Sequence, residues 1–163
     1  MKLTNEILNI LEKDSKLSYE EIAVMTGSDA ETVEKIINEL EEKKVIFGYK
    51  ALVNWDKIEN DKVTAYIELN VTPEQGLGFE KVAENIIREY PQVKSVTLMS
   101  GGFDLLVEID GDNMKEIALF VAEKISPLNC IVSTRTHFVL RKYKQDGVVL
   151  NEKTKDERRV ISL

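Results

Sequence analysis

The chain has 163 residues, 43% of them hydrophobic and 31% charged, which suits one large or two small domains and argues against wholesale disorder. No apolar run approaches the ~18 residues of a membrane span and no signal-peptide pattern follows Met1, so we expect a cytoplasmic protein without a membrane partner. The net charge of −7 gives no general attraction to phosphate, and the single cysteine, Cys130, and single histidine, His137, lead us to expect no disulfide, metal or cofactor.

The first part of the chain is predicted to form short helices. Apolar residues at helical spacing indicate a first helix over residues 4–13. Ser18 and Glu21 form a capping box, in which each side chain accepts a hydrogen bond from the backbone N–H of the other residue. This box opens a second helix, which is expected to end before Gly27 because glycine readily adopts the left-handed conformation of a helix end.

A third helix is predicted to follow almost immediately. Ser28 and Glu31 repeat the capping-box pattern, so we expect Ser28 to cap this helix. Its inward stripe has helical spacing and comprises Val33, Ile36, Ile37 and Leu40. Two helices joined by a tight turn, with another packed behind, indicate a helix-turn-helix over residues 1–53, and the alternative is a small helical docking module. Residues 45–52 suggest a final strand or wing.

A change of period marks a second domain. Residues 54–62 lose the helical periodicity and are expected to be a linker. Residues 63–145 then follow the order βαββαβ, which predicts an α+β, ferredoxin-like sandwich with two helices on one face of an antiparallel sheet. The expected strands are 64–71, 93–99, 103–110 and 131–142, and the expected helices are 79–87 and 114–125, the latter capped by Gly111 and Asp112. Residues 146–163 form a C-terminal extension in which 146–150 suggest a hairpin strand.

The sheet face turned away from the helices is predicted to be too apolar for full exposure. Its expected apolar residues are Tyr66, Leu106, Phe138 and Leu140. A second copy of the same sheet is the simplest cover, so we expect a homodimer. The alternative is that residues 143–163 fold back over this face.

Several short segments carry a resemblance to a known family. The most specific is the turn formed by Gly101, Gly102, Phe103 and Asp104. The other matching segments are 6–11, 21–23, 32–33, 37, 40–41, 45–49, 90–93, 134–136 and 140. Over residues 3–145 the chain resembles the Lrp/AsnC (feast/famine) family of transcriptional regulators. The resemblance implies double-stranded DNA as a partner and a dimer built on the sandwich domains, possibly assembled to an octamer. It also implies an amino acid or related small effector, bound between dimers, and no enzymatic activity.

The candidate DNA contacts lie on and beside the third helix. They are Ser28, Thr32, Lys35, Asn38 and Lys43. Ser28 and Thr32 stand near the helix N-terminus, where backbone N–H groups favour phosphate, and Lys35 and Asn38 are long enough to reach base edges. Each of these residues also fits ordinary solvated surface. Residues 28–44 hold six acids and three lysines, which opposes contact with phosphate.

The candidate effector residues begin with Gly101, Gly102 and Asp104. Glycine lets backbone N–H groups approach a ligand carboxylate, and Asp104 could pair with an α-ammonium group. The alternative is a structural hairpin in which Asp104 caps its own turn. Family analogy adds three hydroxyl residues of the last strand: Ser133, Thr134 and Thr136. Because strand side chains alternate, the two threonines should share one face and Ser133 should lie on the other.

Three functions remain open. The leading one is a sequence-specific DNA-binding regulator that responds to an amino acid. The second is an effector-sensing oligomer that has lost DNA binding, a possibility that the acidic third helix favours. The third is a subunit similar to certain haem-biosynthesis decarboxylases, which share the architecture. Their tetrapyrrole substrate carries several carboxylates and needs clustered basic groups, whereas the last strand offers only Arg135 and Arg141.

Overall fold

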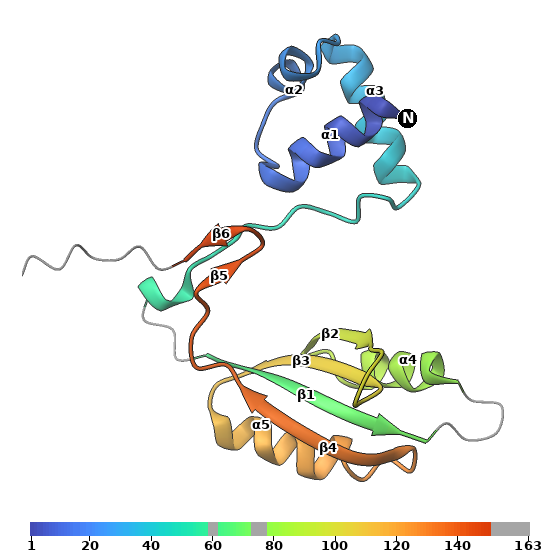
Figure 1. Ribbon diagram of the computed structural model, residues 1–163, viewed down its shortest axis with the longest axis vertical. Coiled ribbons are helices and arrows are strands. Elements are labelled where there is room, and N and C mark those ends of the chain that lie inside the picture. Colours follow the sequence, from blue (N-terminus) through green and yellow to red (C-terminus); the bar gives the residue numbers. More distant parts are fainter. Residues whose placement is uncertain (59–61, 73–77, 151–163) are drawn as a thin grey trace, which may run out of the picture. The chain divides into compact units, whose positions relative to one another are not determined.

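The chain forms two compact units, Met1–Val53 and Asn54–Leu163 (Figure 1). The computed structural model describes residues 1–58, 62–72 and 78–150. In those ranges no helix has both the length and the apolar character needed to span a membrane.

The first unit consists of the helices α1 (Lys2–Lys13), α2 (Tyr19–Thr26) and α3 (Ala30–Glu42). The predicted capping box is confirmed: Ser18 Oγ accepts a hydrogen bond from the Glu21 N–H at 3.3 Å, and Glu21 Oε2 accepts one from the Ser18 N–H at 2.8 Å. Gly27 ends α2 with a left-handed φ of 66°, as predicted. The beginning and end of α2 are therefore determined by local side-chain and backbone chemistry.

The N-terminus of α3 differs from the prediction, because its cap is Asp29 and not Ser28. Asp29 Oδ1 accepts a hydrogen bond from the Thr32 N–H at 2.8 Å, and Asp29 Oδ2 accepts one from Thr32 Oγ1 at 2.8 Å. The Ser28 N–H donates to the Ala23 carbonyl and so closes the end of α2. Asp29 is then the first residue free to take the extended backbone of a cap, with φ −108° and ψ 155°.

The inward stripes of the three helices form the core of the first unit. Ile7, Ile22, Val33 and Ile37 are buried there. Of the predicted strand or wing, the strand is wrong, since residues 45–53 contain no strand. The segment instead turns back on α3, because the N–H groups of residues 45 and 46 both donate to the Leu40 carbonyl. A strand needs a partner to satisfy its backbone, and the first unit offers none.

The second unit contains a four-stranded antiparallel sheet in the order β2-β3-β1-β4 (Figure 1). The strands are β1 (Val63–Val71), β2 (Val93–Leu98), β3 (Leu105–Gly111) and β4 (Ile131–Phe138). The helices are α4 (Phe79–Glu89) after β1 and α5 (Met114–Phe120) after β3, the latter continued by the π-helical turn η2 (Val121–Ile125). The predicted order βαββαβ and the ferredoxin-like sheet are thus confirmed.

One face of the sheet packs against α4 and α5. The buried residues occupy alternate strand positions and the inner helix faces: Ala65, Ile67, Leu69, Val71, Val82, Ile86, Leu105, Val107, Ile109, Ile117, Val121 and Ile125. Ile87, predicted for the helix face, is 59% exposed, because the residue next to buried Ile86 is turned by ~100° around the helix. Asn113 caps α5 by accepting the Glu116 N–H at 2.9 Å. The predicted cap at Gly111 and Asp112 is therefore wrong, since Gly111 still belongs to β3.

The opposite face of the sheet, called the open face below, is less apolar than predicted. Tyr66 and Leu106 lie on it as expected. Phe138, however, pairs with Ala65 in the β1–β4 register and therefore lies on the helix-covered face. Leu140 lies beyond the end of β4 and is 87% exposed. The register of β4 thus removes an aromatic ring from the open face.

Ion pairs and a contact between a carboxylate and an imidazole occupy much of the open face. Glu68 Oε2 accepts a hydrogen bond from Arg135 Nη1 at 3.2 Å, and Glu68 Oε1 lies 3.0 Å from His137 Nε2. On the β2 side of the sheet, Lys94 Nζ lies 2.9 Å from Asp110 Oδ2. Any protein surface that covers this face has to match its charges as well as its shape.

The C-terminal extension begins with a short hairpin. Its strands are β5 (Lys144–Gln145) and β6 (Val148–Val149). Asp146 and Gly147 form the turn with φ values of 47° and 82°, the left-handed pair that suits a two-residue hairpin loop. The predicted strand in 146–150 is confirmed as β6. The rest of the extension, 151–163, lies outside the described residues.

Part of the predicted linker is ordered. The short helix η1 (Trp55–Lys57) follows Asn54, whose Nδ2 donates a hydrogen bond to the Leu150 carbonyl at 3.0 Å. Residues 59–61 of the linker lie outside the described ranges. The start of the second unit is therefore tied to the end of its hairpin.

A side chain at Gly111 is expected to disturb the contact between β3 and α5. A Cβ atom there would lie 2.7 Å from Ile117 Cγ1, and Ile117 is only 1% exposed. Gly111→Ala should lower the free energy of unfolding of the second unit by ~1–3 kcal/mol, because the added methyl group overpacks this contact. Urea titration followed by Trp55 fluorescence measures this free energy. Gly102→Ala is the control, because a Cβ atom there meets nothing within 4 Å. Equal losses in both variants would contradict the packing argument.

Acid is expected to weaken the second unit through Asp110. Burial raises the pKa of this carboxyl group, but hydrogen bonds from Thr64 Oγ1 and Lys94 Nζ outweigh burial and leave the pKa below its usual 3.8. Because the pKa of Asp110 is lower in the folded than in the unfolded chain, the ionised carboxyl group stabilises the fold. This stabilisation is complete above pH 3.8, the usual pKa, and is lost as the pH falls through the folded-state pKa. The wild type should melt above Asp110→Asn at neutral pH, and this gap should narrow below pH 3.8. A gap that stays constant down to pH ~2.5 would refute this linkage.

Candidate DNA-binding surface and effector site

The exposed face of α3 is the candidate DNA-binding surface. Burial of Val33, Ile37 and Leu40 determines which residues of the helix point outward. Lys35 and Asn38 are exposed, as predicted, and line a shallow hollow of about 350 Å³. The remaining residues of the hollow are all acidic: Glu31, Glu34, Glu39 and Glu42. The structure thus brings two predicted DNA contacts together in mainly acidic surroundings.

The other three predicted DNA contacts are engaged within the first unit. The Thr32 N–H and hydroxyl both donate to Asp29, and these hydrogen bonds hold the pKa of the Asp29 carboxyl below its usual value. An ionised carboxylate therefore occupies the helix N-terminus, where Ser28 and Thr32 were expected to favour phosphate. Lys43 Nζ lies 3.2 Å from Glu39 Oε2. The sequence contained a signal for this cap, because aspartate is a preferred N-cap residue. Asp29 stands three residues before Thr32, so its side chain can accept a hydrogen bond from the Thr32 N–H.

The turn between β2 and β3 is the candidate effector site. Gly101 has a φ of 150°, which favours glycine, and both Gly101 and Gly102 are exposed. A Cβ atom at either position would meet nothing within 4 Å. The backbone of this turn is therefore open to approach by a ligand.

Asp104 connects this turn to the end of β1. Its Oδ2 accepts a hydrogen bond from the Val71 N–H at 2.8 Å, and its own N–H donates to the Leu69 carbonyl at 2.9 Å. Because β3 begins at Leu105, the carboxylate replaces the carbonyl that a longer strand would have offered to Val71. Asp104 therefore bridges two strands and does not cap its own turn with its side chain. Among the described residues, its Oδ1 has no hydrogen-bond partner.

The three hydroxyl residues of β4 lie on two faces of the sheet. Thr134 and Thr136 are on the helix-covered face, where the hydroxyl of Thr134 lies 3.3 Å from that of Ser126. Ser133 lies on the open face and accepts a hydrogen bond from Asn70 Nδ2 at 2.9 Å. The predicted division between the threonines and Ser133 is confirmed. Asn70 was not among the predicted site residues, although an amide at an outward position near the end of a strand could have indicated a partner for Ser133.

The turn and the start of β4 meet at one end of β1. Leu69 of β1 pairs with the first residue of β3 on one side and with Thr134 on the other. Asp104 and Ser133 therefore flank the same strand end, about two strand spacings or ~10 Å apart. Thr136 lies farther along β4, opposite Ile67. The structure thus groups most of the predicted effector residues at one sheet end and leaves Thr136 outside the group.

Two family models match the chain. Residues 2–46 match a model described as winged helix-turn-helix DNA-binding, and residues 64–149 match the Lrp/AsnC ligand binding domain. The uncharacterized HTH-type transcriptional regulator YugG of Bacillus subtilis (strain 168) is 47% identical over 166 residues, which cover 99% of each chain. The HTH-type transcriptional regulator FL11 of Pyrococcus furiosus is 27% identical over 143 residues, which cover 88% of this chain and 91% of FL11.

Solved structures share the fold. The transcriptional regulator NMB0573 from Neisseria meningitidis, in its L-Met complex, superimposes with a TM-score of 0.68 at 20% identity, covering 89% of this chain and 92% of that one. AsnC from E. coli gives a TM-score of 0.68 at 19% identity, covering 89% and 95%.

A helix-turn-helix unit joined to a βαββαβ ligand-binding domain defines a class of DNA-binding transcriptional regulators. Within that class the chain belongs to the Lrp/AsnC family of HTH-type regulators.

Proposed function

We propose that this regulator recognises specific DNA sequences through α3 and that an amino acid or related small molecule, bound by the second unit, changes its DNA affinity. The observation that supports this most is the outward position of Lys35 and Asn38 on α3. An asparagine amide can pair with adenine and a lysine with guanine or phosphate. Ser28, Thr32 and Lys43 stand at the two ends of the helix, where they would contact the DNA backbone.

The proposed effector site uses the turn and the adjoining strand ends. The Asp104 carboxylate has one oxygen bonded to Val71 and a second that could accept an α-ammonium group. The exposed backbone at Gly101 and Gly102 suits a carboxylate. Ser133, Thr134 and Thr136 cannot all face one ligand from a single chain, because they lie on two faces of the sheet and Thr136 lies away from this end. Their hydroxyl groups would therefore join the site only with a second subunit completing the shell. The L-Met complex of the neisserial relative supports an amino acid as the effector class.

The proposal includes a homodimer that buries the open faces of two sheets, and further assembly to an octamer. The first unit of each chain, called the headpiece below, is acidic on α3 and should bind DNA weakly by itself. Oligomerisation raises the overall affinity, because linked headpieces bind with a high effective concentration. An effector that prefers one assembly would then change the spacing of the headpieces and hence the DNA affinity. As a chromosomal regulator the protein would act in the cytoplasm.

A gel shift with fragmented genomic DNA tests the proposal. We expect a subset of fragments to shift at low salt, with weaker binding at physiological salt, because phosphate contacts release counterions. Sequencing the bound fragments with and without single amino acids should reveal a common site and one amino acid that changes its occupancy. Uniform binding of all fragments, or none at low salt, would contradict sequence-specific recognition.

A further inference from the structure

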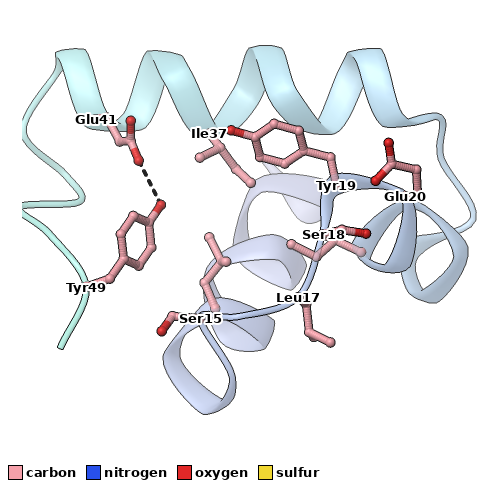
Figure 2. Close-up of a pocket in the computed structure, with 10 residues that line it drawn as sticks. Ser15, Leu17, Ser18, Tyr19, Glu20, Ile37, Glu41 and Tyr49 are labelled. Carbon is pink, nitrogen blue, oxygen red and sulfur yellow. Dashed lines mark hydrogen bonds between the residues drawn. The ribbon is translucent and has the colours of Figure 1, made fainter. Parts of the chain in front are cut away.

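The first unit contains a second hollow that shares no residue with the one on the outer face of α3. It has a volume of about 380 Å³, which lies within the ~300–1,000 Å³ of small-molecule sites. Figure 2 shows it between α3, the start of α2 and the segment that joins α1 to α2. Tyr49, from the chain that follows α3, closes one end. Neither the DNA-contact face nor the effector site uses this pocket.

Apolar and aromatic side chains supply most of the pocket wall. Ile22 and Ile37 are 0% and 2% exposed and form part of the core beneath it. Leu17 adds a further aliphatic surface from the loop before α2. Tyr19 and Tyr49 are partly exposed, so their rings border the opening. A ligand with an apolar or aromatic body can therefore lose water against both aliphatic and aromatic walls.

The charges of the pocket are all of one sign. Glu41 and Glu20 line it, and no lysine, arginine or histidine does so within the described residues. In Figure 2, Glu41 and Tyr49 lie at one end and Glu20 at the other. Hydrogen bonds from its own backbone N–H and from Ser18 hold the pKa of the Glu20 carboxyl below its usual value, so Glu20 is anionic at neutral pH. The pocket thus offers negative potential without an internal counter-ion.

Glu41 is the better placed of the two carboxylates. It is half-buried, whereas Glu20 is exposed. The Tyr49 hydroxyl donates a hydrogen bond to Glu41 Oε1 at 2.8 Å (Figure 2). Partial burial, this hydrogen bond and the charge of Glu41 raise the pKa of Tyr49 to about 12, so Tyr49 stays a neutral donor at physiological pH. One oxygen of Glu41 is thereby held in place, and among the described residues Glu41 Oε2 accepts no hydrogen bond.

We infer that this pocket binds a small organic ammonium ion with an apolar or aromatic body, with the ammonium group paired to Glu41 and the body lying between Tyr19 and Tyr49. The aromatic rings favour a cation through their negative faces, and the absence of a lining cation favours a positive ligand over a zwitterion. Such a ligand contacts residues of both α2 and α3. Because it binds the folded headpiece only, it should stabilise that headpiece by mass action.

The inference is tested by titrating the full chain with phenethylammonium chloride and recording two-dimensional amide NMR spectra at each step. The chemical-shift changes should fall on residues 15–22, 37–41 and 49. Phenethyl alcohol, which carries no charge, should bind more weakly than the ammonium ion. Glu41→Gln should weaken phenethylammonium binding by about fivefold, as loss of one partly exposed charge pair does. Glutamine can still accept the Tyr49 hydrogen bond, so this variant should stay folded. Glu20→Gln, at an exposed position, should weaken binding by a smaller factor and gives a second test.

Glu12→Gln is the matched control, because it removes the same charge from the exposed side of α1 outside the pocket. It should leave the affinity unchanged. The inference is overturned if phenethyl alcohol binds as tightly as the ammonium ion, if Glu12→Gln weakens binding as much as Glu41→Gln, or if the shifts fall outside the pocket residues. DNA binding and the response to amino acids are measured separately, so their failure would not affect this result.

Discussion

Replacing Glu34 and Glu39 with glutamine should tighten DNA binding by about 25-fold at low salt. Each carboxylate on the outer face of α3 would lie close to DNA phosphates. Two unit charges of like sign ~4 Å apart in water repel each other by ~1 kcal/mol, which corresponds to about fivefold in affinity. Loss of Glu39 also releases Lys43, whose ammonium group it now holds at 3.2 Å. Fluorescence anisotropy with a bound genomic fragment, repeated over a range of salt concentrations, measures both the affinity and its salt dependence.

A charge-matched control separates the local effect from the change in net charge. Glu80 and Glu84 lie on the exposed side of α4 in the second unit, and their replacement by glutamine changes the net charge by the same amount. This control should alter the affinity by less than about twofold, because its carboxylates lie outside the contact face proposed on α3 and exposed charges that do not approach the DNA closely are screened by salt. If both double variants bind DNA equally well, α3 is not the contact surface.

Asp104→Ala should destabilise the second unit as well as abolish amino-acid binding. The substitution leaves the part-buried Val71 N–H without its acceptor, which costs ~1–3 kcal/mol. Asp104→Asn is the informative partner, because its amide oxygen can still accept that hydrogen bond while the charge is lost. We therefore expect Asp104→Asn to retain most of the stability and still fail to bind the amino acid.

Urea denaturation followed by Trp55 fluorescence gives the stability of each variant, and calorimetry with single amino acids gives the affinity. Two results would count against the assignment. Normal amino-acid binding by Asp104→Asn would show that the charge has no role in the effector site. Equal stability of Asp104→Ala and the wild type would show that the bridge to Val71 contributes nothing.

The candidate sites were predictable to different degrees. The outward position of Lys35 and Asn38 follows from the apolar stripe of α3, because helical spacing alone determines which residues face away from the core. The pocket at Glu41 was not predictable. It depends on Tyr49 turning back toward the last turn of α3, in a segment for which the sequence suggested a strand or wing.

The amino-acid sequence by itself determined the capping box at Ser18, the end of α2 at Gly27 and the order βαββαβ. These features depend on residues a few positions apart, whose hydrogen bonds and apolar spacing act within one helix or strand. Only the tertiary structure decided that Phe138 faces the helices and that the Asp104 carboxylate binds the Val71 N–H, 33 residues earlier in the chain. Both depend on strand register, in which a shift of one residue exchanges the two faces of a sheet.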